Sequence, residues 1–327
     1  MNVLVVGGAG YIGSATCRSL LEAGHSVTVF DNLAKGHRAA VPPDAELVLG
    51  DTDNPEDLDG AFASRSIDVV MDFAAFIEAG ESMSLPERYF RNNTANVLTL
   101  IEAMLTHDVG RFVFSSSAAV FGNPDRVPIA EDARHEPTNP YGESKLQVER
   151  MLSWISSAHG LRFASLRYFN AAGATSPDCG EDHDPESHLI PLVLAVALGR
   201  REAIPIFGTD YPTPDGTCIR DYVHVADLAS AHLLALEALS TRESVCYNLG
   251  NGLGFSVREV VEIARRVTGH RLPVVERSRR PGDPVALVAS PAAVQADLGW
   301  APDHADLESI VASAWEWHAR HPDGYGD

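Results

Sequence analysis

A tyrosine and a lysine stand four residues apart in the stretch NPYGESKLQVERML, at Tyr141 and Lys145. On a helix, residues i and i+4 lie on one face, so the phenol and the ammonium would be neighbours. A phenol titrates near ~10 in water and is a poor base at neutral pH unless nearby positive charge stabilises the phenolate. Only two of the 25 Lys and Arg residues are lysines, which favours a functional role for Lys145.

Three hydroxyl residues end the apolar stretch RFVFSSS, upstream of this pair. Ser117, the last of them, could hold an alcohol in line with the phenol. Ser117, Tyr141 and Lys145 together would remove a proton from an alcohol while hydride leaves its carbon. Each is individually a common surface residue, so the prediction depends on their combination with a hydride-accepting cofactor.

The elements that must position these residues alternate between apolar strands and helical segments. The strands are expected at NVLVV, HSVTVF, AELVLG, IDVVMDFAA, RFVFSSS and RFASLRYF, and the helices near 12–23, 55–64, 86–107 and 141–159. Continuous apolar strands that alternate with helices are typical of a parallel sheet covered on both faces. The sequence therefore predicts an α/β protein with a doubly wound, Rossmann-like parallel sheet.

The pattern loosens after about residue 170 into Pro- and Gly-rich stretches. We therefore expect a cofactor-binding domain at 1–169 and a smaller mixed α/β substrate lobe at 170–327. The segment 219–250 regains periodicity and could return to the first domain. A last helix is expected at 304–319, because Pro322 would stop it.

A glycine-rich turn, VLVVGGAGYIG, follows the first strand and opens the first helix, with Gly7, Gly10 and Gly13 at regular spacing. Glycines there allow the backbone to approach a pyrophosphate at the helix N-terminus. Asp31, which ends the second strand, suits hydrogen bonds to the adenosine ribose hydroxyls, and its carboxylate would repel a 2′-phosphate. Strand, glycines, helix, strand and acid in this order predict bound NAD rather than NADP.

Two more strand ends could contact the cofactor. Asp51 could meet the adenine amino group, although it and its neighbour Thr52 could equally belong to an N-capping turn. Ala74 and Ala75 are small enough to let a cofactor pass close to the backbone, although core packing would also explain them.

Composition argues against several other classes of protein. A net charge of -20 and a pI near 4.9 disfavour nonspecific binding to nucleic acid or to an anionic membrane. The four cysteines lack metal or disulfide spacing, and no membrane span or signal peptide is evident, so we expect a reducing cytoplasm. The segment EDHDPESH lacks helical ligand spacing and is interpreted as a solvated loop rather than a metal site.

These motifs together resemble the extended short-chain dehydrogenase/reductase superfamily and, within it, the UDP-glucose 4-epimerase family. The narrower resemblance covers nearly the whole chain and rests on GGAGYIGS, YFRNNTAN, SSSAAVFG, NPYGESKL, LRYFNAAGA and FGTDYPTPDGTCIRDYVHVADLA. It implies that NAD stays bound while C4 of a UDP-sugar is oxidised to a ketone and then reduced on its opposite face. UDP-glucose and UDP-galactose are the expected sugars, with UDP-N-acetylhexosamines and UDP-pentoses as alternatives.

The resemblance also implies which residues contact each ligand. Further cofactor contacts are expected at Tyr11, Ile12, Asn32, Phe73, Asn92, Ser115, Tyr141, Lys145 and Tyr168. Substrate contacts are expected at Ser117, Tyr141, Asn170, His188, Leu189, Arg220, Arg280, Asp283 and Leu287. Guanidinium forks suit a diphosphate in a protein whose overall charge would repel it.

Three positions depart from the better-known bacterial pattern of that family. Ile77 stands where a lysine often follows the fourth strand, and His188 where an asparagine often faces the diphosphate. Leu287 stands where the family has either a bulky tyrosine or a small residue, which sets the space beside the sugar 2-substituent. Leucine is intermediate in size between the two. Acceptance of N-acetylated sugars is therefore left open by the sequence.

Two rival functions share this fold. A nucleotide-sugar 4,6-dehydratase would need Asp-Glu after the Ser/Thr, where this chain has Ala118 and Ala119. A noncatalytic NAD-binding regulator could dispense with the Tyr/Lys pair, which this chain retains. The resemblance further implies a homodimer formed by the helices near 86–107 and 141–159.

Overall fold

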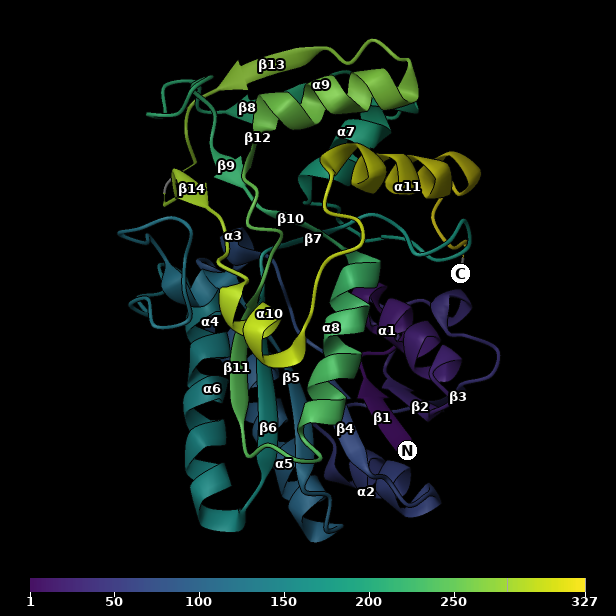
Figure 1. Ribbon diagram of the computed structural model, residues 1–327. Coiled ribbons are helices and arrows are strands. Elements are labelled where there is room, and N and C mark those ends of the chain that lie inside the picture. The colour runs from purple at the N-terminus through teal and green to yellow at the C-terminus, as the bar shows by residue number, and fades with distance from the viewer. Residues whose placement is uncertain (281, 327) are drawn as a thin grey trace.

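The computed structural model describes residues 1–280 and 282–326. Its central feature is a sheet of seven strands, all parallel, in the order β11-β6-β5-β4-β1-β2-β3 (Figure 1). The strands are β1 (Asn2–Val6), β2 (Ser26–Asp31), β3 (Glu46–Leu49), β4 (Val69–Asp72), β5 (Arg111–Ser117), β6 (Arg162–Tyr168) and β11 (Val245–Leu249). The predicted doubly wound parallel sheet is confirmed.

Alternate residues of each strand enter separate cores on the two faces of the sheet, as the pleat requires. In β1, Leu4 and Val6 pack with α2 (Pro55–Ser64), α5 (Asn96–Thr106) and α6 (Pro140–His159). Val3 and Val5 pack on the other face with α1 (Tyr11–Glu22) and α8 (Val225–Ala238). Both faces are therefore buried, which explains why the strands are continuously apolar in sequence.

The segment expected as one helix over 86–107 is interrupted in the structure. It forms α4 (Pro86–Phe90), a π-helical turn η2 (Arg91–Ala95) and then α5. Within η2, the side chain of Asn93 accepts a hydrogen bond from Phe76 N and donates one to Phe76 O, both at 2.9 Å. This long-range pairing to the segment after β4 accompanies the wider turn, a feature common near functional sites.

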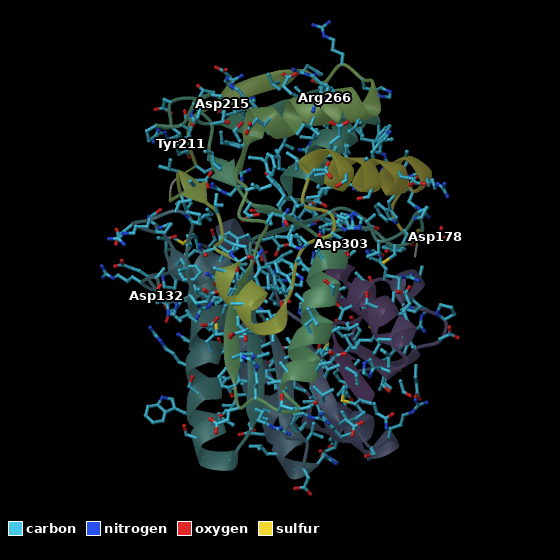
Figure 2. The ribbon with its side chains drawn as sticks, in the orientation of Figure 1. Asp132, Asp178, Tyr211, Asp215, Arg266 and Asp303 are labelled. Carbon is cyan, nitrogen blue, oxygen red and sulfur yellow. The ribbon has the colours of Figure 1, made fainter. Side chains whose placement is uncertain are left out.

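The remaining elements form a smaller C-terminal region beyond one end of the sheet (Figure 1). Tyr211 and Asp215, in the loop of residues 208–218, also lie in this region (Figure 2). Three short sheets pair β7 with β10, β9 with both β12 and β14, and β8 with β13. The elements are β7 (Asn170–Ala172), α7 (Leu189–Ala197), β8 (Ile204–Phe207), β9 (Ile219–Arg220), β10 (Tyr222–His224), β12 (Phe255–Ser256), α9 (Val257–Thr268), β13 (Val274–Arg277), β14 (Ala286–Leu287) and α11 (Leu307–Arg320). The helix α10 (Ala292–Leu298) instead packs against α8 and β11 of the large sheet.

The chain crosses between the two regions more than once. After β7 it builds part of the C-terminal region, and it then returns through α8 to β11, which pairs with β6. Three short helices, η1 (Arg38–Ala40), α3 (Ala79–Ser82) and η3 (Ala118–Phe121), complete the fold. In the part of the chain that the structure describes, no helix combines the length and apolarity needed to span a membrane.

Candidate active site

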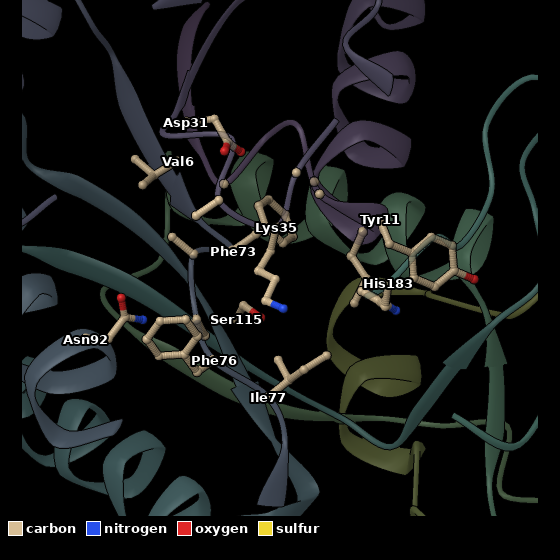
Figure 3. A pocket seen from close by; sticks show the side chains of 18 of the residues that line it. Val6, Tyr11, Asp31, Lys35, Phe73, Phe76, Ile77, Asn92, Ser115 and His183 are labelled. Carbon is tan, nitrogen blue, oxygen red and sulfur yellow. The ribbon is translucent and has the colours of Figure 1, made fainter. Parts of the chain in front are cut away.

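A deep pocket lies where the carboxyl ends of β1, β2, β4, β5 and β6 meet the start of the C-terminal region (Figure 3). Ligands of open parallel sheets bind at this edge because the loops that follow the strands converge there. Its walls include residues from the first glycine turn, from α6 and from the segment after β7. The fold thus gathers into one cavity segments that are far apart in the sequence.

The turn between β1 and α1 gives the pocket a floor without side chains. Gly7 has a φ of +73° and donates its N–H to Phe30 O at 2.9 Å. A Cβ at Gly7 would lie 2.7 Å from Ala74 N, so the turn packs directly on the backbone that follows β4. Gly10 is the N-cap of α1, so the helix N-terminus is open to an anionic group such as a pyrophosphate.

Asp31, at the end of β2, is held by the backbone around it. Its carboxylate accepts hydrogen bonds from Ala9 N at 2.9 Å and Leu33 N at 2.8 Å. Burial raises the pKa of this carboxyl, while these two amides lower it. Next to it, Asn32 Nδ2 donates to Asp51 Oδ2 at 2.8 Å. These polar groups line the same side of the pocket and fit the ribose and base of a dinucleotide.

The predicted catalytic residues come together from two elements. Ser117 ends β5 and caps η3 by accepting a hydrogen bond from Ala119 N at 3.1 Å. Asn139 caps α6 by accepting one from Gly142 N at 2.9 Å, which starts the helix just before Tyr141. Tyr141 and Lys145 then lie one turn apart, and all three predicted catalytic side chains line the pocket.

Lys145 is 3% exposed, and its Nζ donates to Ser115 O at 2.8 Å. Burial lowers the pKa of Lys145 to about 8, although Asp72 raises it, so the ammonium form predominates at pH 7. In turn, burial raises the pKa of Asp72 to about 6, and Lys145 lowers it. The pocket therefore contains a buried positive charge beside the predicted base.

The expected lowering of the Tyr141 pKa by Lys145 is not what the structure shows. Burial raises the pKa of the phenol, the hydrogen bond with Ser117 lowers it, and Glu78 raises it. Desolvation of the phenolate is therefore the largest effect on Tyr141. Ser117, rather than Lys145, provides the favourable interaction within the protein itself.

All of the predicted cofactor-binding residues and some of the predicted substrate-binding residues line the pocket. Those that line it are Gly7, Gly10, Tyr11, Ile12, Gly13, Asp31, Asn32, Asp51, Thr52, Phe73, Ala74, Ala75, Asn92, Ser115, Ser117, Tyr141, Lys145, Tyr168, Asn170 and His188. Ile77, one of the departures from the family pattern, also lines it.

The other predicted substrate positions lie outside this lining: Leu189, Arg220, Arg280, Asp283 and Leu287. Arg220 forms an ion pair with Asp283 and is paired in register with Leu287 between β9 and β14. Arg280 lies over the ring of Phe207, with 4.1 Å between its guanidinium carbon and the ring centroid. Leu189 is the first residue of α7.

Several lining residues were missed by sequence reasoning: Lys35, Phe76, Glu78, Glu181, His183 and Asp184. Lys35 is the only lysine of the chain besides Lys145, a signal that could have found it. The interpretation of EDHDPESH as a solvated loop was wrong for Glu181, which is only 3% exposed. Its burial depends on contacts with α1 and the C-terminal region that local sequence does not reveal.

Comparison with known proteins identifies the family to which this chain belongs. Residues 3–250, which include all but the first residue of the seven-stranded sheet, match the family described as NAD dependent epimerase/dehydratase. The chain belongs to this NAD dependent epimerase/dehydratase family. The glycine turn, Asp31 and the Ser117–Tyr141–Lys145 group all lie inside the matched region.

Individual members of the family are similar over their whole length. A UDP-glucose 4-epimerase of Halalkalibacterium halodurans is 53% identical over 99% of this chain and 98% of its own. The structure of the Brucella ovis UDP-glucose 4-epimerase in complex with NAD is 45% identical, with a TM-score of 0.93 over 96% of this chain and 97% of its own. That of the Bifidobacterium longum enzyme in complex with NAD+ and UDP is 36% identical, with a TM-score of 0.95 over 99% and 100%.

In this member of the NAD dependent epimerase/dehydratase family, Gly7→Ala should both destabilise the fold and prevent dinucleotide binding. The new methyl group would press on Ala74 N in addition to straining a positive φ. We expect the free energy of unfolding, measured with urea, to fall by at least about 3 kcal/mol, and nucleotide released on denaturation to be absent.

Gly24→Ala is the matched control for this prediction. Gly24 has a φ of +81°, yet a Cβ there would meet nothing within 4 Å. The Gly24→Ala variant should lower the free energy of unfolding by only about 1–2 kcal/mol and leave the amount of bound nucleotide unchanged. Equal losses in the two variants would show that the contact with Ala74 is unimportant.

Proposed function

We propose that this protein is an NAD-dependent isomerase that inverts C4 of a UDP-sugar, with UDP-glucose and UDP-galactose as the principal pair. One observation carries the proposal: Ser117, Tyr141 and Lys145 line the same pocket as the glycine turn and Asp31. An alcohol-oxidising group thus lies beside a site suited to a dinucleotide. The whole-length similarity to UDP-glucose 4-epimerases supports the same reaction.

NAD fits the pocket because the floor lacks side chains where Gly7 approaches Ala74, and because Asp31 and Asn32 line one side of it. When bound there, NAD would supply the hydride acceptor for oxidation of C4 and the hydride donor for its reduction on the opposite face. Gly7, Gly10 and Gly13 would bind the pyrophosphate, Asp31 the adenosine ribose, and Lys145 the nicotinamide ribose.

Tyr141 would act as the base that takes the proton of the 4-hydroxyl and later gives it back. Ser117 would hold that hydroxyl, since its side chain already interacts with the phenol. The Ser117 hydrogen bond lowers the Tyr141 pKa against the burial that raises it, and we assign to the Lys145 ammonium a supporting attraction for the negative charge that forms during transfer. The positive charge of a bound nicotinamide would act in the same direction.

The sugar must turn over between the two transfers, so binding energy has to be concentrated on the UDP part. We assign that role to Asn170, His188, Leu189, Arg220, Arg280 and Asp283, with Leu287 beside the sugar 2-substituent. In this assignment residues 1–169, joined by α8 and β11 from the segment 219–250, bind NAD, and the rest of 170–327 binds the UDP-sugar. The four free cysteines are consistent with a reducing, cytoplasmic location.

The experiment that tests this function uses the protein as purified, without added nicotinamide. It is incubated separately with UDP-glucose, UDP-galactose, UDP-N-acetylglucosamine and a UDP-pentose, and the 4-epimers are resolved by chromatography. We expect UDP-glucose and UDP-galactose to interconvert. A product that has lost its 6-hydroxyl would instead indicate a 4,6-dehydratase, which Ala118 and Ala119 argue against.

We also propose a homodimer formed through α4, α5 and α6. Two large apolar side chains on these helices are exposed, Trp154 (78%) on α6 and Leu98 (38%) on α5, and burying them would favour association. Light scattering should give twice the chain mass of 35.1 kDa. Trp154→Glu should shift the protein toward the single-chain mass, and a wild-type monomer at working concentration would refute the proposal.

A further inference from the structure

Four side chains, of which the proposed mechanism uses only His188, converge at the wall of the pocket, in the segment between β7 and α7. We call Glu181, His183, Glu186 and His188 the Glu/His network. Glu181 Oε1 lies 2.6 Å from His188 Nδ1 and 3.4 Å from His183 Nδ1. Glu186 Oε2 lies 3.6 Å from His183 Nδ1. Asp178, labelled in Figure 2, precedes this segment on the side of the molecule where α1 and α11 lie.

The Glu181–His188 pair has the spacing of a shared proton rather than of two metal ligands. One ligand atom from each of the four residues lies within 4.8 Å of the others, which would bring them near a common ion. However, two ligands of a tetrahedral zinc ion at about 2.1 Å lie about 3.4 Å apart. The separation of 2.6 Å between Glu181 Oε1 and His188 Nδ1 is a short, charge-assisted hydrogen bond.

The carboxylates are themselves fixed by the surrounding protein. Glu186 Oε1 accepts hydrogen bonds from Ser187 N and His188 N, both at 2.7 Å, which leaves Oε2 directed at His183. Glu181 is almost fully buried. Lys35, which reaches into the pocket in Figure 3, donates from Nζ to Asp184 O and ties the segment to the loop after β2.

We propose that Glu181 is a positioning residue that keeps His188 as an imidazolium cation at the pocket wall, where it binds the diphosphate of the UDP-sugar. The proposal rests on the proposed function for the identity of that ligand. In a chain of net charge -20, an imidazolium held by a buried carboxylate supplies local positive charge to an anionic ligand. Because His188 is 37% exposed on its side chain, its ring remains accessible to such a ligand.

The direction of titration agrees with this geometry. Burial alone would lower the pKa of His188, but the charge and hydrogen bond of Glu181 raise it. Burial would raise the pKa of Glu181, but His188 and then His183 lower it. His183 likewise has a raised pKa, because its proximity to the carboxylates of Glu181 and Glu186 outweighs burial. Both imidazoles therefore keep their protons to a higher pH than an ordinary histidine, and their charge is lost as the pH rises through these raised values.

Two further rings that face the network, those of Tyr11 and His318, are neutral at neutral pH. Tyr11 packs edge-on against His183, as Figure 3 shows, and burial raises its pKa, so its phenol stays neutral. Burial lowers the pKa of His318 on α11, so that ring is neutral. The remaining neighbours are Lys35, bound to the Asp184 carbonyl, His37 and Asp182, which lie 3.5 Å apart, Cys179, and Tyr325, whose pKa is raised by burial.

The test is the pH dependence of UDP-glucose binding, measured by calorimetry at pH 6 and pH 8 for the NAD-containing enzyme. UDP-glucose is the chosen probe because its diphosphate is a diester with no group that titrates in this range. The wild-type Kd should change less than about threefold, because His188 stays charged throughout. In Glu181→Gln, His188 returns toward its ordinary pKa of about 6.5, and binding should weaken about tenfold from pH 6 to pH 8.

Two further variants keep the result interpretable. Glu22→Gln removes the same charge from an exposed residue at the end of α1 and should bind as the wild type does at both pH values. His188→Asn should bind about tenfold more weakly at pH 6 and pH 8 alike, since a charge-assisted hydrogen bond is lost. Wild-type affinity in His188→Asn, or a pH-independent Kd in Glu181→Gln, would overturn the proposal.

A readout that needs no substrate separates this inference from the proposed function. The ring nitrogen chemical shifts of His188, assigned through His188→Asn, should report imidazolium at pH 7.5 in the wild type and neutral imidazole in Glu181→Gln. If UDP-glucose does not bind at all, the proposed function fails, while these shifts still test the network. A neutral His188 in the wild type, or a stoichiometric metal ion bound to the network, would overturn the inference.

Discussion

Replacing Tyr141 with phenylalanine is expected to lower kcat for UDP-galactose epimerisation by about a thousandfold, the typical contribution of a positioned acid–base group. The ring would still fill its buried place, so the fold and bound NAD should be retained. Only the hydroxyl that accepts and returns the proton of the 4-hydroxyl is lost. Steady-state turnover with quantified bound NAD measures this effect.

Tyr247→Phe is the control for losing a phenol hydroxyl elsewhere in the sheet. Tyr247 in β11 is buried, and its hydroxyl donates to Asp297 Oδ2 at 3.0 Å, away from the pocket lining. This variant should lose some stability and keep its kcat. If Tyr141→Phe kept kcat within tenfold of the wild type, Tyr141 would not be the base, and a noncatalytic role for the pocket would need to be considered.

Replacing Lys145 with methionine should lower kcat by about a hundredfold and reduce the amount of NAD that copurifies. Methionine fills a similar volume but removes the ammonium that donates to Ser115 O. It also leaves the buried Asp72 without its counter-charge, and because Lys145 lowers the pKa of Asp72, that pKa should rise further. Turnover and the nucleotide released on denaturation measure both effects.

Arg150→Met provides the comparison, since Arg150 is an exposed cation on the same helix. Removing its charge should change neither kcat nor NAD content. The same loss of kcat in both variants would mean that the overall charge of α6, and not the buried ammonium, supports catalysis.

The layout of the sheet and the position of the cofactor pocket were predictable because both depend on local pattern. Val3 to Val6 are apolar at every position since both faces of the sheet are covered, and such a run is visible without any structure. Gly7 and Asp31 are recognisable because their roles depend on residue type at the ends of successive strands. Fixed spacing on one helix likewise identified Tyr141 and Lys145.

The features that sequence reasoning missed depend on contacts between distant segments. The π-helical turn at Arg91–Ala95 is associated with the bonds between Asn93 and Phe76, which lie 17 residues apart. The Glu/His network is hidden in a polar segment because burial of Glu181 results from packing against other elements. The raised pKa of Tyr141 has the same origin, since desolvation is a property of the assembled pocket.

The most direct test of the central claim follows a deuterium atom at C4 of UDP-glucose. The account requires the hydrogen on that carbon to leave and return as hydride within one bound complex, while Tyr141 handles only the hydroxyl proton. UDP-galactose formed from the labelled substrate in ordinary water should therefore keep its deuterium at C4. Product with solvent hydrogen at C4 would show that the carbon is inverted by proton exchange, and the proposed reaction would be contradicted.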